Sequence, residues 1–241
     1  MEKIFIILLG VAMFFNSKAG AFETDAFSVK GGKEIKITFI RHGSLMIDCG
    51  EKIIQIDPVS DYADYRQFPK ADFIFITHEH SDHFDKTAIK NSRKDSSQIV
   101  LNPATRNMFG DGLAMRNGDK KEFVNGFTVE AVPAYNTTAG REKFHPKGRD
   151  NGYIFDFDGF RIYVAGDTEN IPEMKNFKNI DIAFLPVNQP YTMTAEQAAD
   201  AALALGAPII YPYHYGATDV KKVWELLRKE KNVDVRIRKM Q

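Results

Sequence analysis

The sequence has 241 residues, 44% of them hydrophobic and 27% charged, which is enough to bury one sizeable core and excludes a disordered chain. Its 32 basic and 32 acidic side chains balance, which excludes the basic surface that binds nucleic acid. Cys49 is the single cysteine, so no intramolecular disulfide can form. We expect a small buried hydrophobic side chain there rather than a reactive thiol.

Residues 1–21 have the pattern of a secretory signal peptide. Lys3 precedes an apolar run from Ile4 to Phe15, and Ala19-Gly20-Ala21 supplies a small-residue cleavage site. The run is about a dozen residues long, whereas a membrane span needs about 20, so a retained anchor is the weaker interpretation. We therefore expect an exported protein, periplasmic or secreted, with a single mature domain over residues 22–241.

Strand patterns dominate the first part of the mature chain. Apolar residues alternate over 35–39, and two further apolar strands, 45–49 and 53–57, flank a turn, which predicts a β-meander. The continuous apolar run Phe73–Ile76 predicts a strand that is buried on both faces. This strand ends directly before Thr77 and a histidine-rich segment.

Strands and helices alternate in the rest of the chain. Residues 84–122 mix helical stretches with polar loops, and strands resume at 127–131. Asp158-Gly159 between two alternating strands, 153–157 and 160–164, predicts a β-hairpin. The later predicted elements are strand 181–185, a helix from Thr194 with capping-box partner Gln197 to Gly206, strand 209–213, a helix with Val220, Val223, Trp224 and Leu227 on one face, and strand 233–237. The order predicts an α+β fold with two sheets packed face to face and helices outside.

Four potential metal ligands lie within six residues, directly after the buried strand. They are the imidazoles and the carboxylate of His78, His80, Asp82 and His83. Both groups are good ligands for Zn²⁺ and related divalent ions, whereas the alternative is a solvated loop with incidental histidines. Because residues two apart at a strand end project alike, His78 and His80 can bind one ion. Asp82 and His83, where the loop turns, can face a second.

The H-x-H-x-D-H pattern of residues 78–83 after a buried strand resembles the metallo-β-lactamase superfamily of dinuclear metallohydrolases. The likeness extends from about residue 35 to about residue 237 and is greatest to the ascorbate-phosphate lactonase-like branch. The resemblance implies a four-layer αββα sandwich of two packed mixed β-sheets with helices on both outer faces. It also implies a site at one edge for two divalent metal ions, zinc first, with manganese or iron as alternatives.

Two later segments resemble further motifs of the superfamily. Residues 164–168 resemble its G-D-T motif, so the resemblance implies that Asp167 bridges both metals; an aspartate that caps a turn is the alternative. Residues 211–216 resemble its closing motif, in which a strand-terminal histidine completes the second metal site. The resemblance therefore adds His214 to Asp82 and His83, against the alternative of a hydrogen-bonded core histidine.

The chain departs from the common pattern at the first metal site. Many members place a histidine after a strand where this chain has Val132-Pro133-Ala134-Tyr135-Asn136. The branch that it resembles carries a later H-P-K-G segment, which residues 145–148 match. The resemblance thus implies His145 as the third ligand beside His78 and His80. The alternative is a surface histidine in a basic loop.

Two residues from earlier turns complete the candidate site. His42 stands in a turn that resembles the G-H-[AGS] turn of the branch and would orient substrate or a ligand, although a turn histidine bonded to backbone is equally compatible. Asp57 ends a strand before Pro58, and in the superfamily such an aspartate hydrogen-bonds a ligand imidazole from behind. The alternative for Asp57 is a turn-initiating residue before proline.

Two metal ions at such a site predict a hydrolase. Zinc can bring the pKa of a bound water to about 7, and the resulting hydroxide would attack an ester, lactone or phosphoester bond of a small molecule. Asp82, in its protonated form, would assist the leaving group, and Asp82 and His42 are the candidate catalytic residues. Four basic residues in loop 141–149 suggest an anionic substrate, and Tyr135, Phe144, Tyr191 and Tyr213 are candidates for an apolar lip.

Two functions of other classes stay open. The superfamily fold also holds iron in redox enzymes, and one iron per chain would favour that alternative. A non-catalytic metal-binding protein is the second. No nucleic acid and, after signal cleavage, no membrane is expected as a partner, and the oligomeric state is left open.

Overall fold

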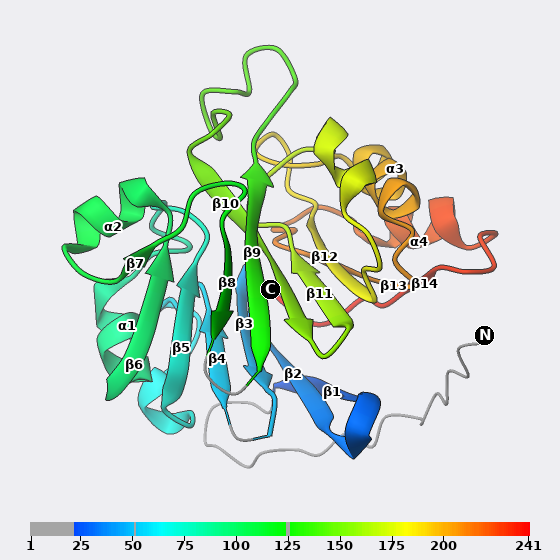
Figure 1. The fold of residues 1–241 in the computed structure, drawn as a ribbon. Coiled ribbons are helices and arrows are strands. Elements are labelled where there is room, and N and C mark those ends of the chain that lie inside the picture. The colour runs from blue at the N-terminus through cyan, green and yellow to red at the C-terminus, as the bar shows by residue number, and fades with distance from the viewer. Residues whose placement is uncertain (1–21, 51, 124–125) are drawn as a thin grey trace.

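The chain forms two β-sheets that pack face to face, with helices on the outside (Figure 1). The structure, a computed structural model, describes residues 22–50, 52–123 and 126–241. The predicted signal peptide of residues 1–21 lies outside the described residues. Within these three described ranges, no helix has the length and hydropathy needed to cross a membrane.

The first sheet has seven strands in chain order. They are β1 (Glu23–Ser28), β2 (Glu34–Arg41), β3 (Ser44–Asp48), β4 (Ile53–Ile56), β5 (Ala71–Ile76), β6 (Arg93–Leu101) and β7 (Leu113–Ala114). Strands β1 to β4 are antiparallel, which confirms the predicted meander, and β4 to β7 are parallel. Strand β6 was missed within 84–122, because only its last three residues, Ile99–Leu101, are buried and apolar.

The second sheet also has seven strands, and these too are neighbours in chain order. They are β8 (Lys120–Phe123), β9 (Phe127–Ala134), β10 (Asp150–Phe157), β11 (Phe160–Val164), β12 (Ile182–Pro186), β13 (Ile209–Tyr213) and β14 (Asp234–Val235). The β10–β11 hairpin confirms its prediction, with φ of 54° at Asp158 and 93° at Gly159. The predicted closing strand 233–237 is only two residues long, because it pairs with β13 over just two positions.

Helices cover the outer face of each sheet, which confirms the αββα arrangement (Figure 1). Helices α1 (Lys86–Ser92) and α2 (Pro103–Phe109) lie on the first sheet, and α3 (Ala195–Leu205) and α4 (Lys221–Leu227) lie on the second. Short 3-10 helices are η1 (Lys30–Gly32), η2 (Tyr65–Gln67) and η3 (Pro172–Asn176). The predicted capping box of α3 is present. Trp224, expected on the apolar face of α4, is 47% exposed instead.

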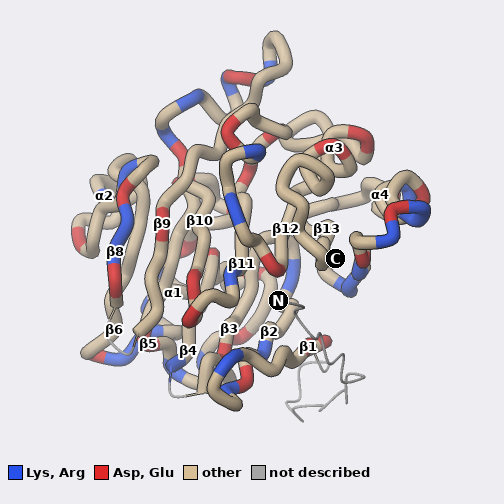
Figure 2. The backbone as a smooth tube through the Cα atoms, turned by 45° about the vertical axis from the view of Figure 1, so that its right-hand side comes forward, with Lys and Arg blue, Asp and Glu red and all other residues tan. Residues whose placement is uncertain are grey.

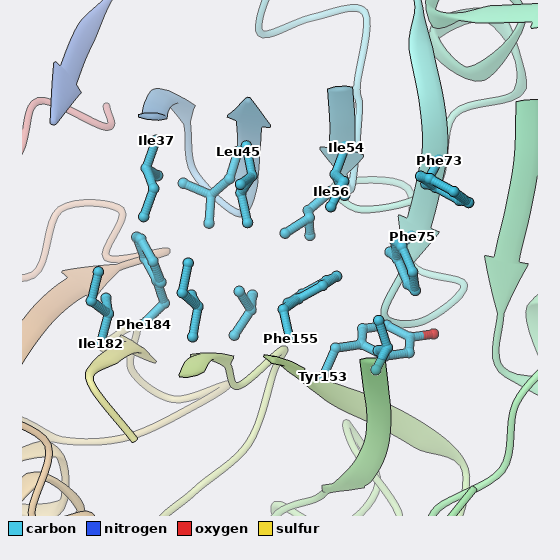
Figure 3. Packing of buried hydrophobic residues seen from close by; sticks show 14 of the residues in the cluster. Ile37, Leu45, Ile54, Ile56, Phe73, Phe75, Tyr153, Phe155, Ile182 and Phe184 are labelled. Atoms are coloured by element: carbon cyan, nitrogen blue, oxygen red, sulfur yellow. The ribbon is translucent and has the colours of Figure 1, made fainter. Parts of the chain in front are cut away.

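Aromatic and branched side chains fill the space between the sheets (Figure 3). Phe75 of β5 meets Phe155 of β10 with ring centroids 4.9 Å apart, and the Tyr153 hydroxyl donates to the Ile76 carbonyl at 2.9 Å. Cys49 is half-buried against this core, and burial raises the pKa of its thiol to about 11, as suits a packing residue. The core therefore holds the end of β5 firmly against the second sheet.

The ends of β5, β11 and β13 meet at one edge of the sandwich. Strands β4–β6 run parallel in one sheet and β11–β13 run parallel in the other, so their carboxyl ends gather there. Two backbone bonds join the sheets at this edge, from Asn151 N to Thr77 O at 3.1 Å and from His214 N to His42 O at 3.1 Å. Side chains that follow these strands are thereby brought to one place.

Candidate metal centre

The structure brings together all seven residues that the sequence suggested as metal ligands. Four follow β5, one follows β11, one follows β13, and one lies in the loop between β9 and β10, which stands out as a green loop in Figure 1. They are His78, His80, Asp82 and His83, then Asp167, His214 and His145. Distant parts of the sequence therefore converge on a single cluster.

Three histidines form the first group of the cluster. His78, His80 and His145 each offer a ring nitrogen, and the three nitrogens lie within 4.8 Å of one another. His78 Nε2 and His80 Nδ1 lie 3.2 Å apart. His145 is buried at 1% exposure, so it is not the surface histidine of the alternative interpretation. It supplies the third nitrogen of this group, in place of the histidine that residues 132–136 lack.

A carboxylate and three histidines form the second group. Asp82 Oδ2 lies 3.2 Å from His42 Nε2, 3.6 Å from His214 Nε2 and 4.0 Å from His83 Nε2. The rings of His42 and His214 approach to 3.7 Å between centroids. His42 thus joins the group that was expected to hold only three ligands.

Asp167 lies between the two groups. Its carboxylate oxygens are 3.4 Å from His83 Nε2, 3.3 Å from His214 Nε2, 3.4 Å from His145 Nε2 and 4.0 Å from His78 Nε2. The side chain is 3% exposed. Members of both groups therefore share one buried carboxylate, as a bridging ligand requires.

Several buried polar atoms at the centre have no hydrogen-bond partner among the described residues. They are His83 Nε2, His214 Nε2 and Asp167 Oδ1. More than about 90% of buried polar groups in native proteins are paired, so three such atoms facing one another call for a partner. Imidazole and carboxylate are the donors that zinc, manganese and iron accept. The residues present thus fit divalent metal ions.

Carboxylates outside the cluster orient two of its histidines. Asp57 Oδ2 lies 2.8 Å from His83 Nδ1, which confirms the contact that the resemblance implied, and Asp57 also accepts bonds from the Thr77 backbone and hydroxyl at 2.8 and 2.6 Å. Asp150 Oδ2 lies 2.9 Å from His145 Nδ1. Sequence reasoning missed Asp150, although its place five residues after His145 at the start of a strand was a usable signal. Each contact leaves Nε2 of its histidine free to face the centre.

Backbone strain also concentrates at the site. His42, Asp57 and His214 have φ of 55°, 44° and 49°, a region that side chains other than glycine rarely enter. The His42 turn is fixed by its neighbours, because its N–H donates to Met240 O at 2.8 Å and its carbonyl accepts from His214 N. Such strain persists where the surrounding structure enforces it, commonly at functional sites.

The charge states of the cluster suit cation binding. Burial lowers the pKa of His78 well below its usual value and also lowers the pKa of His42. Burial opposes ionisation of Asp82, but the neighbouring His214 and His42 lower its pKa below the usual range. Burial likewise opposes protonation of His83, yet three surrounding carboxylates raise its pKa to about 10. The ionised Asp82 carboxylate and the neutral His78 imidazole are ready to bind metal, whereas His83 must release a proton to do so.

Gly166, directly before Asp167, packs closely against Asn151, and replacing it by alanine tests this contact. Gly166 has a φ of 66°, and an added Cβ would meet Asn151 O at 2.7 Å. We expect Gly166→Ala to lower the free energy of unfolding in urea by roughly 2–5 kcal/mol through strain and overpacking. Gly159→Ala, at a φ of 93° in open space, should lose only roughly 1–2 kcal/mol. Equal losses would show that the Asn151 contact is unimportant.

The basic loop differs from its predicted role. Arg141 pairs with Glu169 at 3.4 Å, Lys147 pairs with Glu173 at 3.0 Å, and Arg149 pairs with Asp150 at 2.6 Å and with Glu79 at 3.1 Å. The carboxylates of Glu169 and Asp150 are fully buried, and that of Glu79 is mostly buried. Their ion pairs therefore tie Arg141 and Arg149 to neighbouring parts of the fold. Basic and acidic residues are also interspersed over the described part of the chain (Figure 2).

Two of the four residues predicted to form an apolar lip line the pocket, and two do not. Phe144 and Tyr191 line the pocket above the cluster. Tyr213 is buried in the core at 1% exposure, because it is an inward-facing residue of β13. The Tyr135 hydroxyl donates to Glu173 at 2.8 Å, and the residue packs beneath the loop instead of lining the pocket.

Comparisons with known proteins identify the family. A family model described as a β-lactamase superfamily domain matches residues 36–214. A UPF0173 metal-dependent hydrolase from Thermococcus kodakarensis is 31% identical over 195 residues, which cover 75% of this chain and 84% of that relative. A crystal structure from Parabacteroides distasonis, described as a candidate metal-dependent hydrolase, is 55% identical with a TM-score of 0.89, over 91% of this chain and 100% of that one.

A more distant structure shares the fold. Igni18, a metallo hydrolase from Ignicoccus hospitalis, is 22% identical with a TM-score of 0.72, over 86% of this chain and 95% of that one. The family match reaches the superfamily level, and the ascorbate-phosphate lactonase-like branch stays a prediction. Since the family model spans well over half of the sequence and includes the residues around which the cluster is built, this chain belongs to the metallo-β-lactamase superfamily.

Proposed function

We propose that this chain is a metal-dependent hydrolase that cleaves an ester, lactone or phosphoester bond of a small molecule with two divalent ions, zinc in the first place. The observation that carries the proposal is Asp167, one buried carboxylate with four imidazole nitrogens from three separate chain segments within 4.0 Å. The name of the 31% identical relative and the description of the 55% identical structure support the same activity.

Each group of the cluster would hold one ion. His78, His80 and His145 form the first set of ligands, and Asp82, His83 and His214 form the second. Asp167 would be shared. When bound, a pair of such ions supplies an activated water and polarises the bond to be broken. Two divalent ions carry more positive charge than the two cluster carboxylates neutralise, so an anionic reacting group such as a phosphoester is favoured.

Asp82 is the residue placed to move a proton. Its side chain is 41% exposed at the pocket, whereas that of Asp167 is 3% exposed. In hydrolysis the water oxygen bonds to the carbonyl carbon or phosphorus, the ester bond breaks, and the leaving oxygen takes up a proton. Asp82 would carry that proton from the water side to the leaving oxygen, and His42 Nε2, 3.2 Å away, would hold the carboxylate in position.

Metal content and turnover test the function together. Protein purified without added metal is expected to contain two zinc or manganese ions per chain and to hydrolyse at least one of a set of lactones, esters, phosphodiesters and β-lactams. Asp82→Asn should lower kcat/KM at least about 100-fold, because loss of residues that merely orient a ligand already costs about 10- to 100-fold. Asp95→Asn, on the exposed part of β6, is the matched control.

Other outcomes favour the rival functions. One iron per chain without hydrolysis would favour a redox enzyme. Bound metal without turnover of any substrate class would favour a metal-binding protein. Turnover that Asp82→Asn leaves unchanged would remove the proposed role of this carboxylate.

We also propose that the protein is exported and acts in the periplasm or outside the cell, on the strength of the leader pattern in residues 1–21. The mature protein recovered from cell fractions of a bacterial host is expected to begin near Phe22 by N-terminal sequencing. A chain that stays in the cytoplasm with Met1 retained would contradict the proposal.

A further inference from the structure

The pocket above the cluster has an aromatic wall. It is a cavity of about 330 Å³, and its floor is formed by His80, Asp82, His145, Asp167 and His214. The remaining lining residues are Ser81, Phe144, Asn188 and Tyr191. The ring centroids of Phe144 and Tyr191 lie 5.1 Å apart at an angle of 74°. The two rings therefore stand beside the cluster within the same cavity.

Hydrogen bonds anchor the backbone of both aromatic residues. The amide of Asn136 donates to the Tyr191 carbonyl at 2.7 Å, and the N–H of Asn136 donates to the His145 carbonyl at 2.9 Å. Arg149 donates to the Phe144 carbonyl at 2.7 Å. Asn136 thus ties together the two loops that carry the rings. The wall stands at a fixed distance from the cluster, which is what a recognition surface needs.

The Tyr191 ring is open to solvent and the Phe144 ring is half-buried, while the backbones of both residues are fixed. Tyr191 is 46% exposed, and its hydroxyl has no hydrogen-bond partner within the described part of the chain. The side-chain amide of Asn188 likewise has no hydrogen bond to a described residue. An aromatic pair beside polar groups that are free to bond is the usual composition of a small-molecule site.

Lysine and arginine are missing from the lining of this pocket, although Lys143 lies beside it over the Phe144 ring. The nine lining residues include no lysine or arginine. Three of the four basic residues of loop 141–149 are paired with carboxylates, and the fourth, Lys143, lies over the Phe144 ring at 5.1 Å. A carboxylate or phosphate remote from the reacting bond would meet no cation among the lining residues. The wall instead suits an apolar, planar group.

We propose that the substrate carries an uncharged ring next to the bond that is hydrolysed, and that Phe144 and Tyr191 bind this ring. The inference rests on the proposed hydrolase function and adds the class of substrate. Asn188 bonds a polar substituent at the ring edge. Any anionic charge of the substrate lies at the reacting group, above the metal cluster, and not on the ring.

Paired substrates that differ only in the ring test the inference. One pair is γ-phenyl- and γ-methyl-γ-butyrolactone, in which water opens the ring ester to a hydroxy acid. The other is methyl phenylphosphonate and methyl methylphosphonate, in which water displaces the same methanol. For the metal-loaded protein we expect kcat/KM to be about tenfold or more higher for the phenyl member, the range that one apolar group gives in a hydrophobic pocket.

Variants test whether Phe144 and Tyr191 cause the preference for the phenyl substrates. Tyr191→Ala and Phe144→Ala should each lower the phenyl-to-methyl ratio of kcat/KM to within about threefold, whereas Tyr191→Phe should keep it. Trp224→Ala is the matched control, because Trp224 on α4 is an equally exposed aromatic residue, at 47%, outside the pocket lining. Equal turnover of phenyl and methyl members, or a ratio that Tyr191→Ala leaves intact, would overturn the inference and leave the hydrolase function standing. If the protein hydrolysed another member of the wider substrate set but neither of these pairs, the inference alone would be overturned.

Discussion

Asp167→Asn is expected to abolish paired metal binding and to lower hydrolysis more than any other single change in the cluster. Its carboxylate is buried between the two groups of ligands and faces four of their nitrogens. An asparagine of the same shape lacks the negative charge and presents an amide donor to cations. We expect a loss of kcat/KM of more than about 100-fold, since outer residues that merely orient a ligand contribute about 10- to 100-fold.

Metal content and kcat/KM of the Asp167→Asn protein check this expectation. Asp158→Asn is the control, because Asp158 is exposed in the β10–β11 turn and asparagine tolerates its φ of 54°. That variant should keep both its metal and its activity. If Asp167→Asn protein still held two ions per chain and turned over substrate normally, Asp167 would not be the shared ligand.

Asp57→Asn is expected to lower both the stability of the metal-free protein and its affinity for zinc. Asp57 is 1% exposed and accepts hydrogen bonds from Thr77 and His83 with both carboxylate oxygens. An asparagine accommodates the φ of 44°, but its NH₂ group would face one of these donors. We expect a loss of about 3 kcal/mol in the free energy of unfolding, the cost of leaving buried partners of a charge unsatisfied.

Two measurements on the Asp57→Asn protein separate its effects. Urea unfolding in the presence of a chelator reports the loss of stability, and competition with a zinc indicator reports an affinity about 10- to 100-fold lower. Asp111→Asn, an exposed substitution, should change stability by no more than about 0.5 kcal/mol. An Asp57→Asn protein with unchanged zinc affinity would mean that His83 is oriented without help from this carboxylate.

The parts of the fold that could be predicted are those with strong local signals. Asp158-Gly159 between alternating strands specifies a tight turn, and Thr194 with Gln197 specifies a helix start, whatever surrounds them. Strand β6 lacked such a signal, because its first six residues are polar and it forms by pairing with β5. Trp224 matched the helical spacing but faces solvent, since the pattern cannot tell which edge of an apolar stripe is covered.

The candidate site was predictable where ligands follow recognisable strands. His78, Asp167 and His214 each stand at the end of an apolar run, so their meeting at one sheet edge could be expected. The ion pairs of Arg141 and Arg149 could not, because their partners lie in other parts of the chain and the loop had no strand to place it. Asp150 is a different case, because its place five residues after His145 at the start of a strand was a usable signal, although its bond to His145 also depends on how the loop folds back.

The bond between His42 and Met240 has a consequence for how the protein can vary. Met240 is fully buried and its carbonyl accepts from the N–H of His42, while Arg238 bonds to Asp25 of β1. The tail of the chain therefore braces the turn that presents His42 to Asp82. Substitutions in residues 238–240 can therefore shift His42 relative to Asp82 and change the pocket, while every candidate metal ligand keeps its identity.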